Sequence, residues 1–126
     1  MSLNNKDFNL CIGGYDWGAA IALKMCLKNS NNFKRVIAFH PSYNEETNNE
    51  LASIKIPTLI QWVKEDQFHP WKEWQKLAKK IKGAQVDVFS IAKFKSEFSA
   101  NSYEKISNKV TSSIVKFITG VDYLNP

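Results

Sequence analysis

The chain has 126 residues, 44% hydrophobic and 13% aromatic, which is enough apolar surface for one globular core and too much for a disordered segment. No apolar run approaches the length of a membrane span, and the first residues lack the basic-then-apolar order of a signal peptide, so we expect no membrane association. Without a secretory signal, Cys11 and Cys26 favour free thiols and a cytoplasmic location. We expect a leader over residues 1–7, one domain over 8–120 and a tail over 121–126.

The net charge of +5 and the isoelectric point near 9.2 raise the question of nucleic-acid binding. Almost all of the positive charge comes from lysine, with Arg35 as the single arginine. The densest lysine group, over 72–82, falls on the polar side of one expected helix. Aromatic and basic residues do not alternate along a strand, as a base-stacking sheet requires. We therefore expect no nucleic-acid partner.

Strand and helix signals alternate from the first residues onward. The apolar run over 8–13 predicts a buried strand, and the small apolar residues of 19–27 predict a helix that packs closely on a sheet. A second short strand is expected over 36–39. The polar stretch after it contains a weak helix signal over 50–54.

The second half of the chain continues this alternation. A strand is expected over 56–63, and Pro70 suits the first turn of a helix that ends before Gly83. A fourth strand over 85–89 and a long helix over 102–118 complete the order. Strands that alternate with helices predict an α/β fold with three layers, a mostly parallel sheet of about four strands and helices on both faces.

The segment Gly14-Tyr15-Asp16-Trp17-Gly18 joins the first expected strand to the first expected helix. A small residue two places before and two places after a central residue is typical of the strand–turn–helix elbow that presents a nucleophile. Strand and helix nearly touch at such a turn, so side chains at Gly14 and Gly18 are expected to clash. Asp16 is then expected at the carboxyl edge of a parallel sheet, where such folds place their chemistry.

With these motifs the chain resembles the carboxyl-terminal half of the α/β-hydrolase fold over about residues 8–118. The segment 14–18 is similar to the elbow of epoxide hydrolases and haloalkane dehalogenases, in which the nucleophile is Asp. The segment Ala38-Phe39-His40-Pro41-Ser42 is similar to dienelactone hydrolases, in which the nucleophile is usually Cys. The short spacing from Phe39 to Ile56 leaves no room for the cap of epoxide hydrolases, which favours the dienelactone-hydrolase layout.

The resemblance implies a role for three residues. Asp16 takes the nucleophile position, the backbone N–H of Trp17 takes the position of an oxyanion donor, and Asp66 takes the position of the triad's acid. The implied activity is hydrolysis of a small ester, lactone, epoxide or halide, with no cofactor. The absence of G-x-G-x-x-G and Walker patterns agrees with that expectation, and no H-x-x-H or H-x-H spacing suggests a metal site.

The histidine of such a triad follows the last strand, and the corresponding stretch here, 92–98, contains none, with Ser96 or a neighbour at its position. His40 and His69 are the only histidines, and each follows an expected strand. Either is a candidate for a displaced base, and an ordinary loop histidine is the alternative for each. The missing histidine supports a second hypothesis, that of a non-catalytic scaffold for binding or assembly.

The resemblance also implies that the first four strands of the fold have no counterpart in this chain. The strand over 8–12, which is central in the family, then lies at an open edge of the sheet. Open edges invite pairing with another chain. We therefore expect a homodimer or other self-association through this strand or the apolar face beside it.

Overall fold

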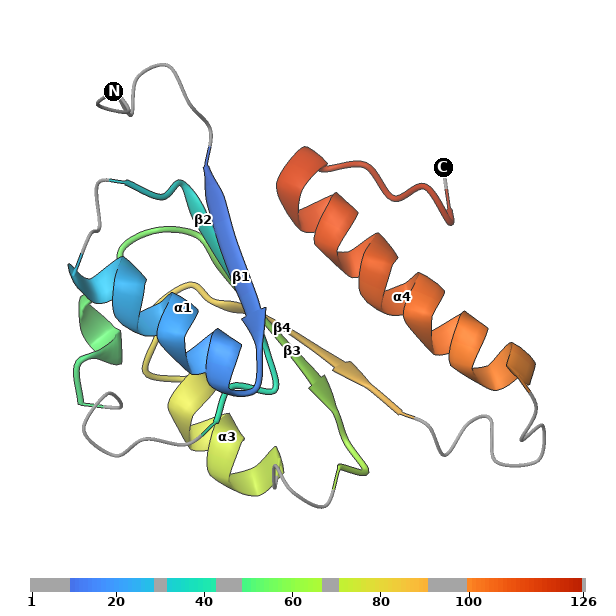
Figure 1. Cartoon of the computed structure of the whole chain (residues 1–126), viewed down its shortest axis with the longest axis horizontal. Helices are drawn as coiled ribbons and strands as arrows, with labels where there is room; N and C mark the ends of the chain where they lie inside the picture. The colour runs from blue at the N-terminus through green and yellow to red at the C-terminus, as the bar shows by residue number, and fades with distance from the viewer. Residues whose placement is uncertain (1–9, 29–31, 43–48, 67–70, 91–99, 126) are drawn as a thin grey trace.

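The computed structural model describes residues 10–28, 32–42, 49–66, 71–90 and 100–125. In this part of the chain strands and helices alternate in the expected order (Figure 1). The elements are β1 (Cys11–Tyr15), α1 (Trp17–Lys28), β2 (Arg35–Phe39), the 3₁₀ helix η1 (Leu51–Ser53), β3 (Thr58–Val63), α3 (Trp71–Ala78), β4 (Gln85–Phe89) and α4 (Ala100–Thr119).

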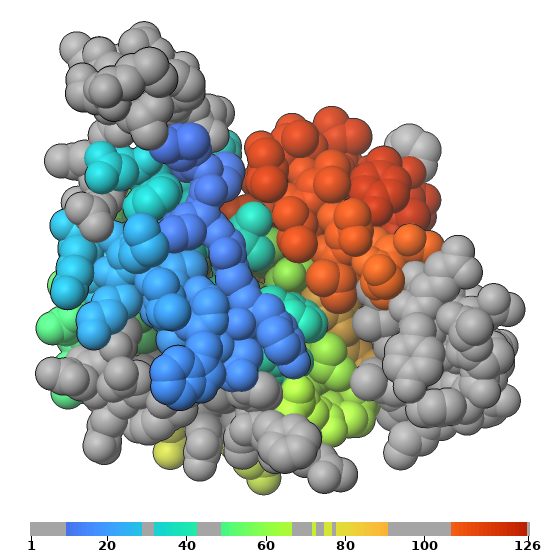
Figure 2. All heavy atoms as spheres, viewed as in Figure 1, coloured from blue at the N-terminus to red at the C-terminus, as the bar shows by residue number. Residues whose placement is uncertain are grey.

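The four described strands form one parallel sheet in the order β1-β2-β3-β4. The strands lie in chain order, so β1 and β4 form its two edges among the described elements. The space-filling view shows β1 and α1, in blue, at the front surface (Figure 2). Among the described elements, no strand pairs with the outer side of β1, so β1 is an edge strand of the described sheet, as expected.

Helices cover both faces of the sheet, so the predicted three-layer α/β fold is confirmed. Helix α1 packs on β1 and β2, and α3 lies on the same side of the sheet as α1 (Figure 1). Helix α4 packs on β3 and β4 from the other side. The main contacts of α4 are with β3 and β4, and β1, at the other end of the described sheet, alternates between exposed and half-buried residues.

The larger core lies between the sheet and α1. Ala19 and Ala22 are fully buried because their small side chains let the helix axis come close to the strands. The other buried members of this cluster are Leu23, Cys26, Val36, Ala38, Leu51, Ile54, Ile60, Trp62, Ala78 and Ile81. The sequence predicts that α1 is apolar nearly all round, and the structure leaves three of its apolar residues, Trp17, Ile21 and Met25, on the solvent side.

A polar cluster fixes α4 to the sheet. Gln61 is fully buried on β3, and its side-chain amide donates to the carbonyl of Val110 at 3.0 Å and to the hydroxyl of Ser113 at 3.1 Å. Ser113 in turn donates to the carboxylate of Asp87, which lies beside Gln61 in the register of β3 and β4. The amide nitrogen of Gln61 therefore joins β3 to α4 through two hydrogen bonds, which fix the position of the helix more specifically than apolar contact does.

The sequence placed the first strand too early. It predicted 8–13, and the structure has β1 at Cys11–Tyr15, with Phe8 and Asn9 outside the described residues. The strand continues past Gly13, the last residue of the predicted run, because Gly13 and Gly14 pair with Ile37 and Ala38 of β2. Helix α1 begins directly after the turn at Asp16.

Candidate active site

Asp16 is the turn residue between β1 and α1, and its backbone is left-handed, with a φ of 55°. Residues other than glycine rarely adopt this conformation, because it brings Cβ against the backbone. A Cβ placed on Gly14 would lie 2.2 Å from the carbonyl carbon of Gly18, so the strand and the helix touch at this point. The structure thus contains the strained elbow that the sequence predicts.

Backbone hydrogen bonds hold Asp16 in this conformation. Its N–H donates to the carbonyl of Phe39 at 3.0 Å, and its carbonyl accepts from the N–H groups of Ala20 and Ser42, each at 3.1 Å. Two of these partners come from the end of β2 and the residues after it, so the turn is joined to the neighbouring strand as well as to its own helix. Such surroundings keep a strained residue in place.

Gly18 does not fit the prediction of a clash. A Cβ on Gly18 would meet no atom within 4 Å outside its own helix. The close approach is one-sided, because the backbone of Gly18 fills the space above Gly14, whereas the hydrogen of Gly18 points elsewhere. Only Gly14 is therefore required to be glycine on steric grounds.

His40 follows β2 at the same edge of the sheet and is 1% exposed. It is the second described residue other than glycine with a positive φ, at 45°. Its N–H donates to the carbonyl of Gln61 at 3.0 Å. The turn after β2 is therefore as constrained as the turn after β1.

The ring of His40 is packed among aromatic side chains. It meets Trp62 and Phe39 edge-on, with centroid distances of 4.7 Å and 4.8 Å, and lies 6.2 Å from the ring of Tyr15. Its Nε2 accepts a hydrogen bond from the N–H of Val63 at 3.0 Å. This bond occupies the lone pair that a general base needs at that nitrogen, and it places the proton of the neutral ring on Nδ1.

Asp66 lies just after β3, where its Oδ2 is 3.6 Å from Nε2 of His40. Its N–H donates to the carbonyl of Val63 at 3.1 Å. The same loop is tied to β4, since Lys64 N–H donates to the carbonyl of Phe89 at 2.9 Å and the hydroxyl of Ser90 donates to Glu65. Asp66 thus sits on a fixed turn beside a histidine.

Three of the predicted site residues therefore come together. Asp16, His40 and Asp66 follow β1, β2 and β3, which are neighbours in the sheet, at the carboxyl ends of the strands. The side chain of Trp17 is exposed at the first position of α1. His69 and the stretch around Ser96 lie outside the described residues.

Neither cysteine takes the place of the nucleophile. Cys26 is on the buried face of α1, and burial raises the pKa of its thiol to about 11, so it carries no thiolate near neutral pH. Cys11 begins β1, at the end of the strand opposite to Asp16.

Among the described residues, no group of three or more His, Cys, Asp or Glu side chains is arranged to hold a metal ion. None of the described helices is both long and apolar enough to cross a membrane.

Family membership follows from a sequence match that covers most of the chain. A model of the dienelactone hydrolase family matches residues 2–112. The chain belongs to the dienelactone hydrolase family. Its four-stranded parallel sheet is part of an α/β-hydrolase fold, so the predicted fold and the predicted likeness to dienelactone hydrolases are confirmed. No curated protein sequence matches the chain.

Solved structures with the same fold are larger than this chain. The enol-lactonase from Burkholderia xenovorans matches with a TM-score of 0.65 and 13% identity, over 88% of this chain and 65% of the lactonase. The predicted CIB-like hydrolase from Thermoplasma acidophilum matches with a TM-score of 0.62 and 21% identity, over 65% of this chain and 40% of the hydrolase. Est1E from Butyrivibrio proteoclasticus matches with a TM-score of 0.65 and 11% identity, over 88% of this chain and 62% of Est1E. The chain therefore spans less than two thirds of the length of each of these structures.

The elbow geometry predicts that the two glycines respond differently to substitution. Gly14→Ala would force Cβ into the backbone of Gly18, which costs about 3 kcal/mol of unfolding free energy or more. Gly18→Ala stays within about 1 kcal/mol of the wild type, because its Cβ enters open space on a helix. Urea unfolding followed by circular dichroism measures both, and equal effects would contradict the one-sided contact.

The packing of His40 predicts a mainly structural side chain. His40→Phe keeps a ring among the aromatic neighbours and leaves the N–H of Val63 without its acceptor, at a cost of about 1–3 kcal/mol. His40→Ala also loses the packed ring and costs about 3 kcal/mol or more. Asp66→Asn is the control and changes stability by less than about 1 kcal/mol. Near-wild-type stability of both His40 variants would refute this interpretation.

Proposed function

We propose that the chain is the carboxyl-terminal half of a hydrolase fold in which Asp16 is the nucleophile toward a small ester, lactone or epoxide. The observation that supports this most is the backbone of Asp16, which is left-handed and hydrogen-bonded at the carboxyl edge of the sheet. Proteins hold a residue in such a conformation where its side chain must be presented. The chain belongs to a family of hydrolases, so a residue presented in this way is a candidate for a role in hydrolysis.

In this proposal a carboxylate oxygen of Asp16 attacks an electrophilic carbon and displaces an oxygen of the substrate. The N–H of Trp17, at the start of α1, donates to the oxygen on which charge develops. With an epoxide, ring opening leaves an alkyl ester of Asp16 and an alkoxide that takes a proton from water. A second water then attacks the carboxyl carbon of Asp16, which releases the diol and restores the carboxylate.

Turnover is expected to be slow. His40 is buried and its Nε2 is bonded to the backbone of Val63, so activation of the second water is poor unless this bond opens. Loss of the base of a triad lowers the rate by several orders of magnitude. The first, covalent step does not need a base, and the second step leaves an oxygen atom of water in the carboxylate of Asp16, which a test can detect.

The proposal predicts oxygen exchange at Asp16. After turnover of a small epoxide or a chromogenic short-chain ester in ¹⁸O-labelled water, mass spectrometry is expected to find the label in the peptide that contains Asp16. Asp16→Ala is expected to lower the rate at least about tenfold, while Asp66→Ala, with the elbow intact, still acquires the label. Equal rates for the wild type and Asp16→Ala, with no label at Asp16, would refute the proposal.

A second candidate function is assembly, and the open edge of the sheet favours it. Three apolar side chains of α1 lie on one helix face at intervals of four residues: Trp17, Ile21 and Met25, which are 75%, 54% and 39% exposed. Helix α1 packs on the edge strand β1, whose Tyr15 is exposed, and Figure 2 shows both elements at one surface. We propose that a second copy of the chain covers this surface, because an open edge next to apolar side chains is a site of strand pairing.

Sedimentation measures this self-association. The wild type is expected to be dimeric at micromolar concentration, and the double variant Ile21→Lys, Met25→Lys is expected to weaken the dimer at least about tenfold. Val88→Lys is the matched control, since Val88 is 41% exposed and lies at the opposite edge of the sheet. A wild-type monomer at high concentration, or a loss of the dimer in the control alone, would contradict the proposal.

A further inference from the structure

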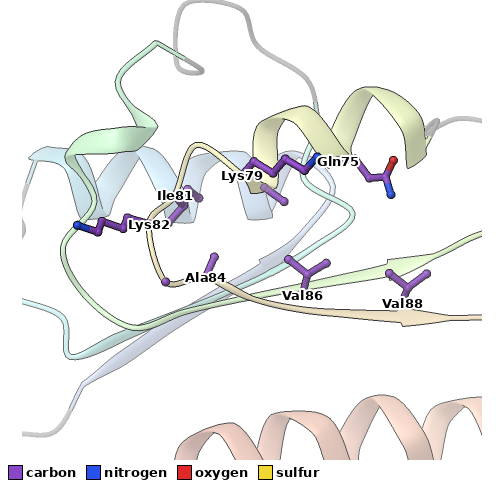
Figure 3. A pocket seen from close by; sticks show the side chains of 9 residues that line it. Gln75, Lys79, Ile81, Lys82, Ala84, Val86 and Val88 are labelled. Atoms are coloured by element: carbon purple, nitrogen blue, oxygen red, sulfur yellow. The ribbon is translucent and has the colours of Figure 1, made fainter.

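A groove lies between α3 and β4, on the sheet face opposite to α4 (Figure 3). Its volume is about 570 Å³, within the range of about 300–1,000 Å³ that is common for small-molecule sites. It runs beside the edge strand farthest from β1, so the width of the sheet separates it from the elbow at Asp16. The lining residues are Gln75, Ala78, Lys79, Ile81, Lys82, Gly83, Ala84, Val86 and Val88.

The floor of the groove is apolar. Ala84, Val86 and Val88 alternate along the start and length of β4 and point to the same side of the sheet (Figure 3). Ala78 and Ile81 are buried behind them and belong to the main core. Val88 is left 41% exposed, which is unusual for a valine in a strand beside a helix. An apolar group laid along this floor would remove that surface from water.

The rim of the groove carries positive charge only. Lys79 and Lys82 line it from the residues that follow α3, and their side chains point in opposite directions, with Gln75 on the side toward which Lys79 points (Figure 3). Both lysines are exposed, and none of the nine lining residues is acidic. An anionic group at this rim therefore meets cations and hydrogen-bond donors without a competing carboxylate in the lining.

We propose that this groove binds a small anionic amphiphile, with a carboxylate head at Lys79 and an apolar body on Val86 and Val88. The apolar floor accounts for the body and the basic rim for the head. A neutral apolar compound would use only the floor, and a cationic one would be repelled by the rim. The site is independent of the chemistry proposed for Asp16, because the two lie at opposite edges of the sheet.

Octanoate, 1-octanol and octyltrimethylammonium form a matched set of probes, with one chain length and three charges. Titration followed by amide NMR shifts is expected to show saturable binding of octanoate at Ala84, Val86 and Val88. The octanol affinity is expected to be about threefold to tenfold lower, and the cation is expected not to bind there. Added salt is expected to weaken octanoate binding and to leave octanol binding unchanged.

Two variants test the basic rim and the apolar floor of the groove separately. The double variant Lys79→Ala, Lys82→Ala is expected to bring the octanoate affinity down to that of octanol, and Val88→Asp is expected to abolish both. Lys24→Ala, on the exposed side of α1, and Ile118→Asp, with a similarly exposed apolar side chain on α4, are the controls and leave binding unchanged. All of these sites are partly or fully exposed, and circular dichroism verifies that each variant folds.

Three results would overturn the proposal. Equal affinities for octanoate and octanol would remove the role of the rim. Changes in the amide NMR shifts of α1, with none in β4, would show that the ligand binds outside the groove. Binding of an acidic extended peptide along β4, with no binding of octanoate, would make the groove a peptide-docking edge.

Discussion

The close contact of β1 with α1 at Gly14 is the constraint on which the rest of the structure depends. The backbone of Gly18 lies where a side chain of Gly14 would be, so the chain must turn within one residue, and Asp16 absorbs that turn with a positive φ. The turn brings the carbonyl of Asp16 to Ser42 and its N–H to Phe39. The start of the helix, the register of the first two strands and the position of the candidate nucleophile therefore follow from one contact.

The carboxyl edge of the sheet has a rigid frame around a histidine that is already engaged. Aromatic rings surround His40, and the backbone of Val63 donates to its Nε2. The neighbouring carboxylate of Asp66 is 3.6 Å away, at the distance of an ion pair should the ring become protonated. This arrangement stabilises the ends of β2 and β3. In this chain the turn at Asp16 is therefore present, while the ring of His40 is used for packing and for a backbone hydrogen bond.

Most of the fold was predictable because hydrophobic periodicity and turn residues are local signals. They gave the order of strands and helices, the parallel sheet and the position of Asp16 at its edge. The burial of His40, the buried amide of Gln61 and the asymmetry between Gly14 and Gly18 depend on contacts between distant segments, which no local pattern contains. For Gln61, a polar residue in an otherwise apolar strand opposite Asp87 was a visible signal of the polar cluster.

The central claim is that the elbow and its neighbouring turn form one hydrogen-bonded unit, and amide hydrogen exchange tests it most directly. The N–H groups of Asp16, Ser42 and Val63 each lie in or beside a turn, where exchange is ordinarily fast. Because they donate to Phe39, Asp16 and His40, the account predicts exchange as slow as in the middle of β2 and β3. Fast exchange at these three groups, with the strands protected, would contradict it.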